Sequence, residues 1–189
     1  MTIQAIQTLD PWEDYPKIDL YMDQVLNIVN KQLSLYFKDP KEGAITASMV
    51  NNYVKQGLLS RPEKKKYRPE QVTRLVMIGI LKQVLTIAQI MKLFELLLEE
   101  KEGSESELYM AFRDSLDRSF ERMWLQGEYP LLPQPQGTSD ILDLALISFL
   151  TRFEATALLD DLGDFEPLKS SLPEEVKESP IEELSLPLE

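Results

Sequence analysis

The chain has 189 residues and a formal net charge of −12 at pH 7, enough for one domain with an extension and a tail. It contains no cysteine and no histidine, which excludes thiolate redox chemistry, zinc sites built from those residues and every triad with a histidine base. Charges interrupt every apolar run short of the roughly 20 residues that span a bilayer, and the N-terminus does not resemble a signal peptide. We therefore expect a cytoplasmic protein that does not bind membranes.

Residues 1–16 form an N-terminal arm, because Pro11 and Pro16 prevent a continuous helix. Trp12 and Tyr15 are the side chains that can pin this arm to the body. The arm is followed by a domain that we place at residues 17–98.

Apolar residues recur every three or four positions from Ile18 to Leu33, which predicts a helix with one buried face that ends near Phe37. Asp39-Pro40 and Gly43 then predict a turn.

A second, shorter helix is predicted from Thr46, its N-cap, to just before Gly57. Its inward positions are Ala47, Val50 and Val54. Its other face carries short and amide side chains that can hydrogen-bond base edges and phosphates in a major groove. An ordinary solvated helix surface is the alternative interpretation of this face.

The segment that follows, residues 60–68, is called the basic turn below. Leu58 and Leu59 can anchor its base and Tyr67 can close its far side, so that two short extended arms would flank a lysine-rich tip as a wing. Residues 46–92 contain nine lysines and arginines against two glutamates, a local charge of +7 in an acidic chain. Such a concentration favours a polyanionic partner, although a solvated loop is the usual explanation of a basic run.

Three more helices follow. Residues 70–85 are apolar around much of their circumference, so they are expected to form a buried scaffold in which Gly79 marks a close helix contact. Thr86 caps the next helix, whose apolar stripe indicates packing rather than a cofactor site. Ser104 opens a further helix to Trp124, with ion pairs expected on its surface.

The C-terminal part divides into a helical extension, residues 99–163, and a tail, residues 164–189. After a proline-rich break at 127–137, a nearly all-apolar helix is predicted from Thr138 to about Asp160, placed either at the centre of the helical body or in the interface of a homodimer. The tail has eight acidic and two basic residues, which predicts disorder. It could compete with DNA for the basic turn.

Several runs of residues resemble the winged helix-turn-helix of MerR-type regulators over about a quarter of the chain, roughly residues 45–97. They are Val50-Asn51-Asn52-Tyr53, Gly57-Leu58-Leu59, the basic turn closing on Tyr67, Glu70-Gln71-Val72 with Leu75, and Thr86-Ile87-Ala88-Gln89-Ile90. Residues 19–25, 46–58 and 61–65 are more specifically similar to a bacterial family catalogued as domain of unknown function 1836, a similarity that spans most of residues 12–160. These resemblances imply a mainly α protein that regulates transcription.

One departure matters, because MerR-type proteins usually carry an arginine where this chain has Asn51. The lysines of the basic turn would therefore make more of the contacts with the DNA phosphates. The MerR cysteines and ligand domains have no counterpart, so metal or drug sensing is not carried over, and any small-molecule effector is unknown.

These observations predict a sequence-specific regulator that binds double-stranded DNA, with the second helix in the major groove and the basic turn on phosphates. The alternative is an all-helical protein–protein adaptor. We expect no enzyme, cofactor or metal ion, because the acidic residues form surface runs rather than a paired site. The predicted DNA-binding residues are Ser48, Asn51, Asn52, Tyr53, Lys55, Arg61, Lys64, Lys65, Lys66, Tyr67 and Arg68.

Overall fold

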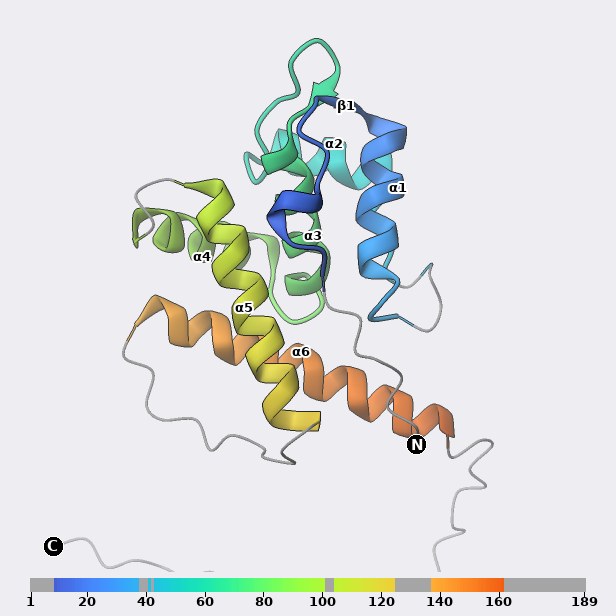
Figure 1. Ribbon diagram of the computed structural model, residues 1–189, viewed down its shortest axis with the longest axis vertical. Coiled ribbons are helices and arrows are strands. Elements are labelled where there is room, and N and C mark those ends of the chain that lie inside the picture. The colour runs from blue at the N-terminus through green and yellow to red at the C-terminus, as the bar shows by residue number, and fades with distance from the viewer. Residues whose placement is uncertain (1–8, 38–40, 42, 101–103, 125–136, 162–189) are drawn as a thin grey trace, which may run out of the picture.

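The computed structural model describes residues 9–37, 41, 43–100, 104–124 and 137–161. Six α-helices and a two-stranded antiparallel sheet make the described part mainly α, as expected (Figure 1). The elements are η1 (Trp12–Asp14), β1 (Leu20–Tyr21), α1 (Met22–Leu33), α2 (Ala47–Lys55), β2 (Lys66–Tyr67), α3 (Pro69–Leu81), α4 (Ile87–Glu100), α5 (Glu105–Trp124) and α6 (Thr138–Asp161). The predictions for residues 1–8, for Asp39-Pro40, for most of the proline-rich break and for the acidic tail lie outside the described residues.

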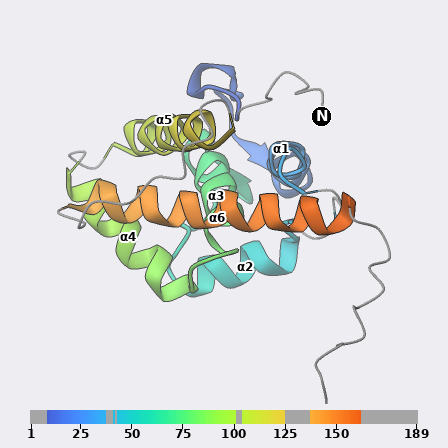
Figure 2. The ribbon, with the colours of Figure 1, turned by 90° about the horizontal axis from the view of Figure 1, so that it is seen from below.

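Helix α3 is the scaffold of the fold, as its composition predicted. Residues 71–73 and 75–81 are all buried, and α1, α5 and α6 pack around the helix (Figures 1 and 2). It ends at Leu81, earlier than expected, because residues 82–85 form turns that lead into the cap of α4. A helix without a solvent-exposed face is expected at the centre of a core.

The close helix contact predicted at Gly79 is confirmed. A Cβ atom placed on Gly79 would lie 2.5 Å from Cδ1 of Leu33 in α1. Real Cβ atoms do not approach other atoms so closely, so the absence of a side chain is what lets α1 and α3 pack at this distance.

The first helix begins at Met22, and the prediction that it begins at Ile18 is wrong. Leu20 and Tyr21 instead form β1, which pairs with β2 of the basic turn in the register Leu20 to Tyr67 and Tyr21 to Lys66. Ile18 is 68% exposed and is not part of the buried face. Three-and-four spacing is a local pattern, and here backbone pairing with a distant strand outweighed it.

The described part of the N-terminal arm is docked on α1 and α5. Tyr15 is buried, and its hydroxyl oxygen lies 3.0 Å from that of Tyr109 in α5. The Tyr109 hydroxyl donates to the Asp10 carbonyl (2.7 Å), and Gln32 Nε2 of α1 donates to the Asp10 carboxylate (2.6 Å). Tyr15 therefore pins the arm as predicted, and Trp12 is partly buried and packs against the core.

The caps of the later helices are also as predicted. Thr86 and Gln89 cap α4 reciprocally, since each backbone N–H donates to the other residue's side chain. The Ser104 hydroxyl accepts from the Glu107 N–H (3.3 Å) at the start of α5. On the surface of α5, Arg113 and Asp117 form an ion pair of 3.6 Å.

Helix α6 runs across α3, α4 and α5 (Figure 2). Among residues 138–156 of this helix, the buried ones are Leu142, Ala145, Leu146, Phe149 and Leu150. The helix thus contributes one face to the core, and Ile141 remains exposed. None of the helices in the described part of the chain is both long and apolar enough to cross a bilayer.

Candidate nucleic-acid interface

Helix α2 is defined at both ends by its own sequence. The Thr46 Oγ1 atom accepts from the Met49 N–H (3.3 Å), which confirms the predicted N-cap. Gly57 follows the C-cap with φ +79°, and the Leu58 N–H donates back to the Tyr53 carbonyl (3.0 Å). This Schellman arrangement ends the helix after nine residues and turns the chain toward the basic turn.

The side chain of Asn30 in α1 fixes the backbone of Ile45, the residue just before the N-cap of α2. Its Nδ2 atom donates to the Ile45 carbonyl (3.0 Å), and its Oδ1 atom accepts from the Ile45 N–H (2.7 Å). Both backbone groups of the residue before the N-cap are therefore satisfied by one side chain. We did not single out Asn30 from the sequence, although an amide within a helix, where it is disfavoured, was an available signal.

The exposed face of α2 is formed by four of the five predicted residues in this helix. Ser48, Asn51, Asn52 and Lys55 are all exposed; the two asparagines lie three and four positions after Ser48, and Lys55 lies three and four positions after them, which is the spacing of one helix face. Of the predicted inward positions Val50 is buried and Val54 half-buried, but Ala47 is exposed, which corrects that part of the prediction.

Tyr53 does not belong to the exposed face of α2, and its prediction as a DNA-contacting side chain is corrected. It is only 4% exposed, and burial raises the pKa of its hydroxyl. In a nine-residue helix Val50 and Tyr53 are the only fully buried side chains, so Tyr53 is needed to hold α2 on the body.

The tip of the basic turn is a two-residue hairpin. Glu63 and Lys66 exchange backbone hydrogen bonds of 3.0 and 2.8 Å, and Lys64 (φ +48°) and Lys65 (φ +65°) between them both have positive φ. Two consecutive positive φ values define a type I′ turn, which normally carries Asn-Gly. Both lysines are exposed at this tip, as predicted.

The sheet that supports the tip differs from the predicted wing. Beyond Glu63 the two arms of the basic turn do not pair with each other, and β2 pairs with β1 instead.

Tyr67 is also removed from the predicted interface by this pairing. Leu20 and Tyr67 face the core, and Tyr67 is 3% exposed. Tyr21 and Lys66 form the next pair, and successive residues of a strand point to opposite faces. The Lys66 ammonium lies 5.0 Å from the centroid of the Tyr21 ring.

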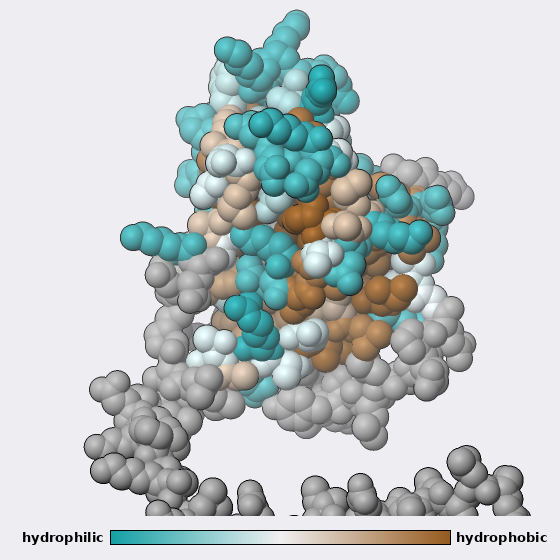
Figure 3. Space-filling model, turned by 180° about the vertical axis from the view of Figure 1, so that it is seen from behind, coloured by the Kyte–Doolittle hydropathy of each residue, from teal (hydrophilic) through white to brown (hydrophobic). Residues whose placement is uncertain are grey.

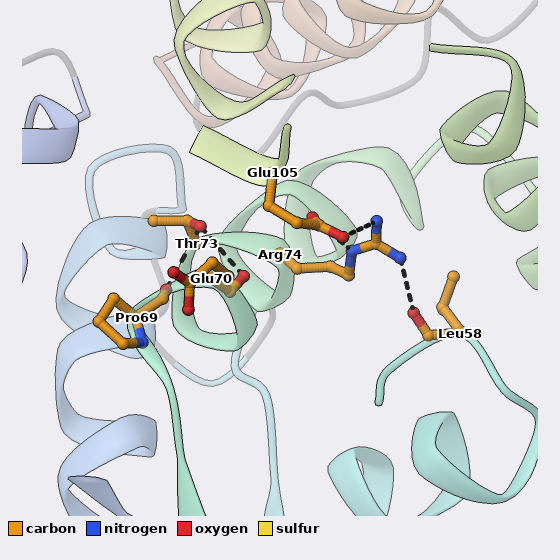
Figure 4. A network of polar contacts seen from close by, with 6 residues as sticks. All are labelled: Leu58, Pro69, Glu70, Thr73, Arg74 and Glu105. Carbon is orange, nitrogen blue, oxygen red and sulfur yellow. Dashed lines mark hydrogen bonds and ion pairs between the residues drawn. The ribbon is translucent and has the colours of Figure 1, made fainter. Parts of the chain in front are cut away.

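Not every cation between residues 46 and 92 is available to a partner. Arg74 forms two contacts with the Glu105 carboxylate, Nη2 to Oε1 at 2.6 Å and Nε to Oε2 at 3.1 Å (Figure 4). Its Nη1 atom donates to the Leu58 carbonyl (3.4 Å), so this arginine ties the base of the basic turn to α5. Lys82 is half-buried, and burial lowers its pKa.

The available cations are concentrated on α2 and the basic turn. Within the described residues, no carboxylate lies at ion-pair distance from Lys55, Arg61, Lys64 or Lys65, all of which are exposed. Arg68 pairs with Glu63 on the surface, a solvated arrangement that contributes little to stability.

Gln71 braces the basic turn from below. Its side chain is buried, its Oε1 atom accepts from the Arg68 N–H (2.8 Å), and its Nε2 atom donates to the Ser60 carbonyl (2.8 Å). One amide thus joins the two ends of the turn. The basic turn projects from one end of the molecule next to α2, and hydrophilic residues cover that end (Figures 1 and 3).

Comparison with protein families shows what the chain is similar to. The family model described as "Domain of unknown function (DUF1836)" matches residues 10–114, which include both strands, α2, the basic turn and Glu105. Neither the curated proteins nor the solved structures provide a significant match.

Proposed function

The chain belongs to the family described as Domain of unknown function (DUF1836), and we propose that it is a sequence-specific DNA-binding regulator of transcription. The observation that carries the proposal is one short helix with an exposed row of amide, hydroxyl and lysine side chains, joined directly to a rigid turn with exposed lysines. Helix α2 lies in the major groove, where Asn51 and Asn52 read base edges. The basic turn lies along the backbone, where each lysine neutralises a phosphate.

The local architecture is a MerR-like winged helix-turn-helix, with the basic turn as its wing. The pairing of β1 with β2 supports this proposal, because it anchors the basic turn to a small sheet. The Asn30 clamp on Ile45 and the Gln71 brace hold α2 and the turn. Preorganisation of this kind reduces the ordering cost of binding.

The protein acts as a homodimer through its helical extension. Ile141 of α6 is an exposed aliphatic residue on a helix whose other face is buried, and two copies would present two α2 helices to the half-sites of one operator. Light scattering of the full chain tests the dimer, and a monomer at micromolar concentration would exclude it at that concentration.

The same extension supports the second candidate function, an adaptor that binds another protein. Met110 of α5 and Ile141 of α6 are both exposed and could be covered by a partner. The adaptor predicts no salt-dependent binding to duplex DNA.

The deciding experiment is a titration of duplex DNA from the gene's own upstream region with the full chain over a series of salt concentrations. The regulator predicts a steep decrease of affinity with salt. Replacing Lys64 and Lys65 by alanine should reduce the log–log salt slope by about two. A matched control replaces Lys31 and Lys92, two exposed lysines of α1 and α4, and should leave the slope nearly unchanged. Absence of any retardation at low salt would count against DNA binding.

The proposal that α2 recognises the DNA base sequence is tested separately. Replacing Asn51 and Asn52 by alanine should lower the preference for operator over random duplex by about 1–3 kcal/mol for each lost bidentate contact. Binding to random duplex should persist, because the lysines remain.

A further inference from the structure

An aromatic side chain that we did not predict lies on the outer face of the small sheet. Tyr21 is 52% exposed, and the register of β1 and β2 places it directly opposite Lys66. Ile18, three residues before it, is the most exposed large apolar side chain of the described residues. An exposed aromatic ring beside a lysine of the basic turn calls for a physical explanation.

The position of Tyr21 is well determined. Its backbone N–H donates to Gln24 Oε1 (2.9 Å) at the first turn of α1, and its backbone is paired with β2. The Lys66 ammonium 5.0 Å from its ring centroid is within the range of a cation–π interaction. The ring therefore restrains Lys66 as well as being exposed itself.

The charges around Tyr21 select the class of partner. A protein partner with an apolar surface would have to bury Lys64, Lys65 and Lys66 without counter-charges, which is costly. A phosphate backbone supplies those counter-charges and also offers apolar sugar edges. Asp19 and Asp23 flank Tyr21 in the sequence, so a phosphate would approach from the Lys66 side.

We propose that Tyr21 is a further DNA-contacting residue, placed on the sugar–phosphate backbone of the strand that the basic turn follows. Its hydroxyl donates to a phosphate oxygen, and its ring holds Lys66 toward the adjacent phosphate. The contact thus extends from the basic turn onto β1, and Tyr21 takes the place that we had predicted for Tyr67. This inference rests on the proposed function and adds a contact to it.

The test uses the full chain and a fluorescent duplex that carries the gene's upstream region. Tyr21→Phe should weaken binding about threefold to tenfold by removing one hydrogen bond, and Tyr21→Ala by more than tenfold. Asn27→Ala, an equally simple truncation of an exposed, uncharged side chain on α1, is the matched control and should change the affinity less than twofold. Thermal unfolding of each variant by circular dichroism verifies that the fold is retained.

A double-mutant cycle of Tyr21→Ala with Lys66→Ala tests the link between the two residues. The combined loss should be smaller than the product of the two single losses, because Lys66 loses its restraint when the ring is removed. Strictly multiplicative losses would show that the ring does not position Lys66 and would overturn that part of the proposal.

The two hypotheses fail in distinguishable ways. If the unmodified chain binds the duplex and Tyr21→Ala binds as well as Asn27→Ala, Tyr21 is not a contact although the protein binds DNA. If the unmodified chain binds no duplex at low salt, both hypotheses are overturned. Binding of poly-glutamate instead, with the same dependence on Tyr21, would assign the surface to an acidic peptide.

Discussion

The tip of the basic turn should store backbone strain that can be relieved by two substitutions. Lys64 and Lys65 occupy the two positive-φ positions of a type I′ turn, which favours Asn followed by Gly. Strain of this type at non-glycine residues costs about 1 kcal/mol or more each and is found at functional sites. The substitution Lys64→Asn with Lys65→Gly should therefore stabilise the fold.

The expected gain can be estimated from these contributions. Relief at two positions amounts to about 2 kcal/mol, and the additional freedom of glycine in the unfolded chain offsets about 1 kcal/mol of it. A net gain of about 1 kcal/mol in the free energy of unfolding corresponds to about 2–4 °C in Tm for a chain of this size. The same variant loses two cations, so its salt slope for duplex DNA should decrease by about two.

Differential scanning calorimetry and a DNA titration measure the two effects. The control variant, Lys64→Gln with Lys65→Gln, loses the same charges but keeps side chains at both positive-φ positions. It should show the same loss of DNA binding without the gain in Tm. If the Asn-Gly variant is no more stable than the Gln-Gln variant, the lysines are not strained and the reasoning is refuted.

Three further predictions concern the parts that support the site. Glu105→Ala leaves Arg74 without its carboxylate and should cost about 2 kcal/mol of unfolding free energy by chemical denaturation, whereas an unchanged midpoint would mean that the pair is not formed in solution. Gly79→Ala should cost about 1–3 kcal/mol in the same assay because its Cβ would overlap Leu33, and a neutral result would show that α1 can shift. Burial raises the pKa of three tyrosine hydroxyls above the ordinary value of 10, so their contribution to stability is complete below pH 10 and is lost as the pH rises through their folded pKa. These tyrosines are Tyr15, Tyr36 and Tyr109. Absorbance at 295 nm should show that their ionisation coincides with alkaline unfolding rather than preceding it.

Elements defined by neighbouring residues were predictable from the sequence. Thr46, Thr86 and Ser104 each cap a helix through a side chain that reaches only three residues along the chain. Gly57 ends α2 because few other residues adopt its positive φ without strain. The exposed row from Ser48 to Lys55 follows from the helical period once these ends are known.

Several of the errors share an origin, which is contact between distant parts of the chain. Residues 18–21 continue the spacing of a helix, yet Leu20 and Tyr21 pair with a strand that follows α2. That pairing exposes Tyr21 and buries Tyr67, since each strand residue faces opposite to the next. The ion pair of Arg74 with Glu105 likewise removes a cation that a count of charges had assigned to the surface.

The amino-acid order by itself therefore determined where α2, α4 and α5 begin, where α2 ends, which face of α2 is polar, and that lysines gather in the turn after it. These features depend on side chains a few residues apart, whose geometry is the same in any helix or turn. Only the tertiary structure decided which tyrosine is exposed, which arginine is neutralised and which strand supports the lysine tip. Those outcomes depend on contacts between residues far apart in the sequence, which no local period or spacing can predict.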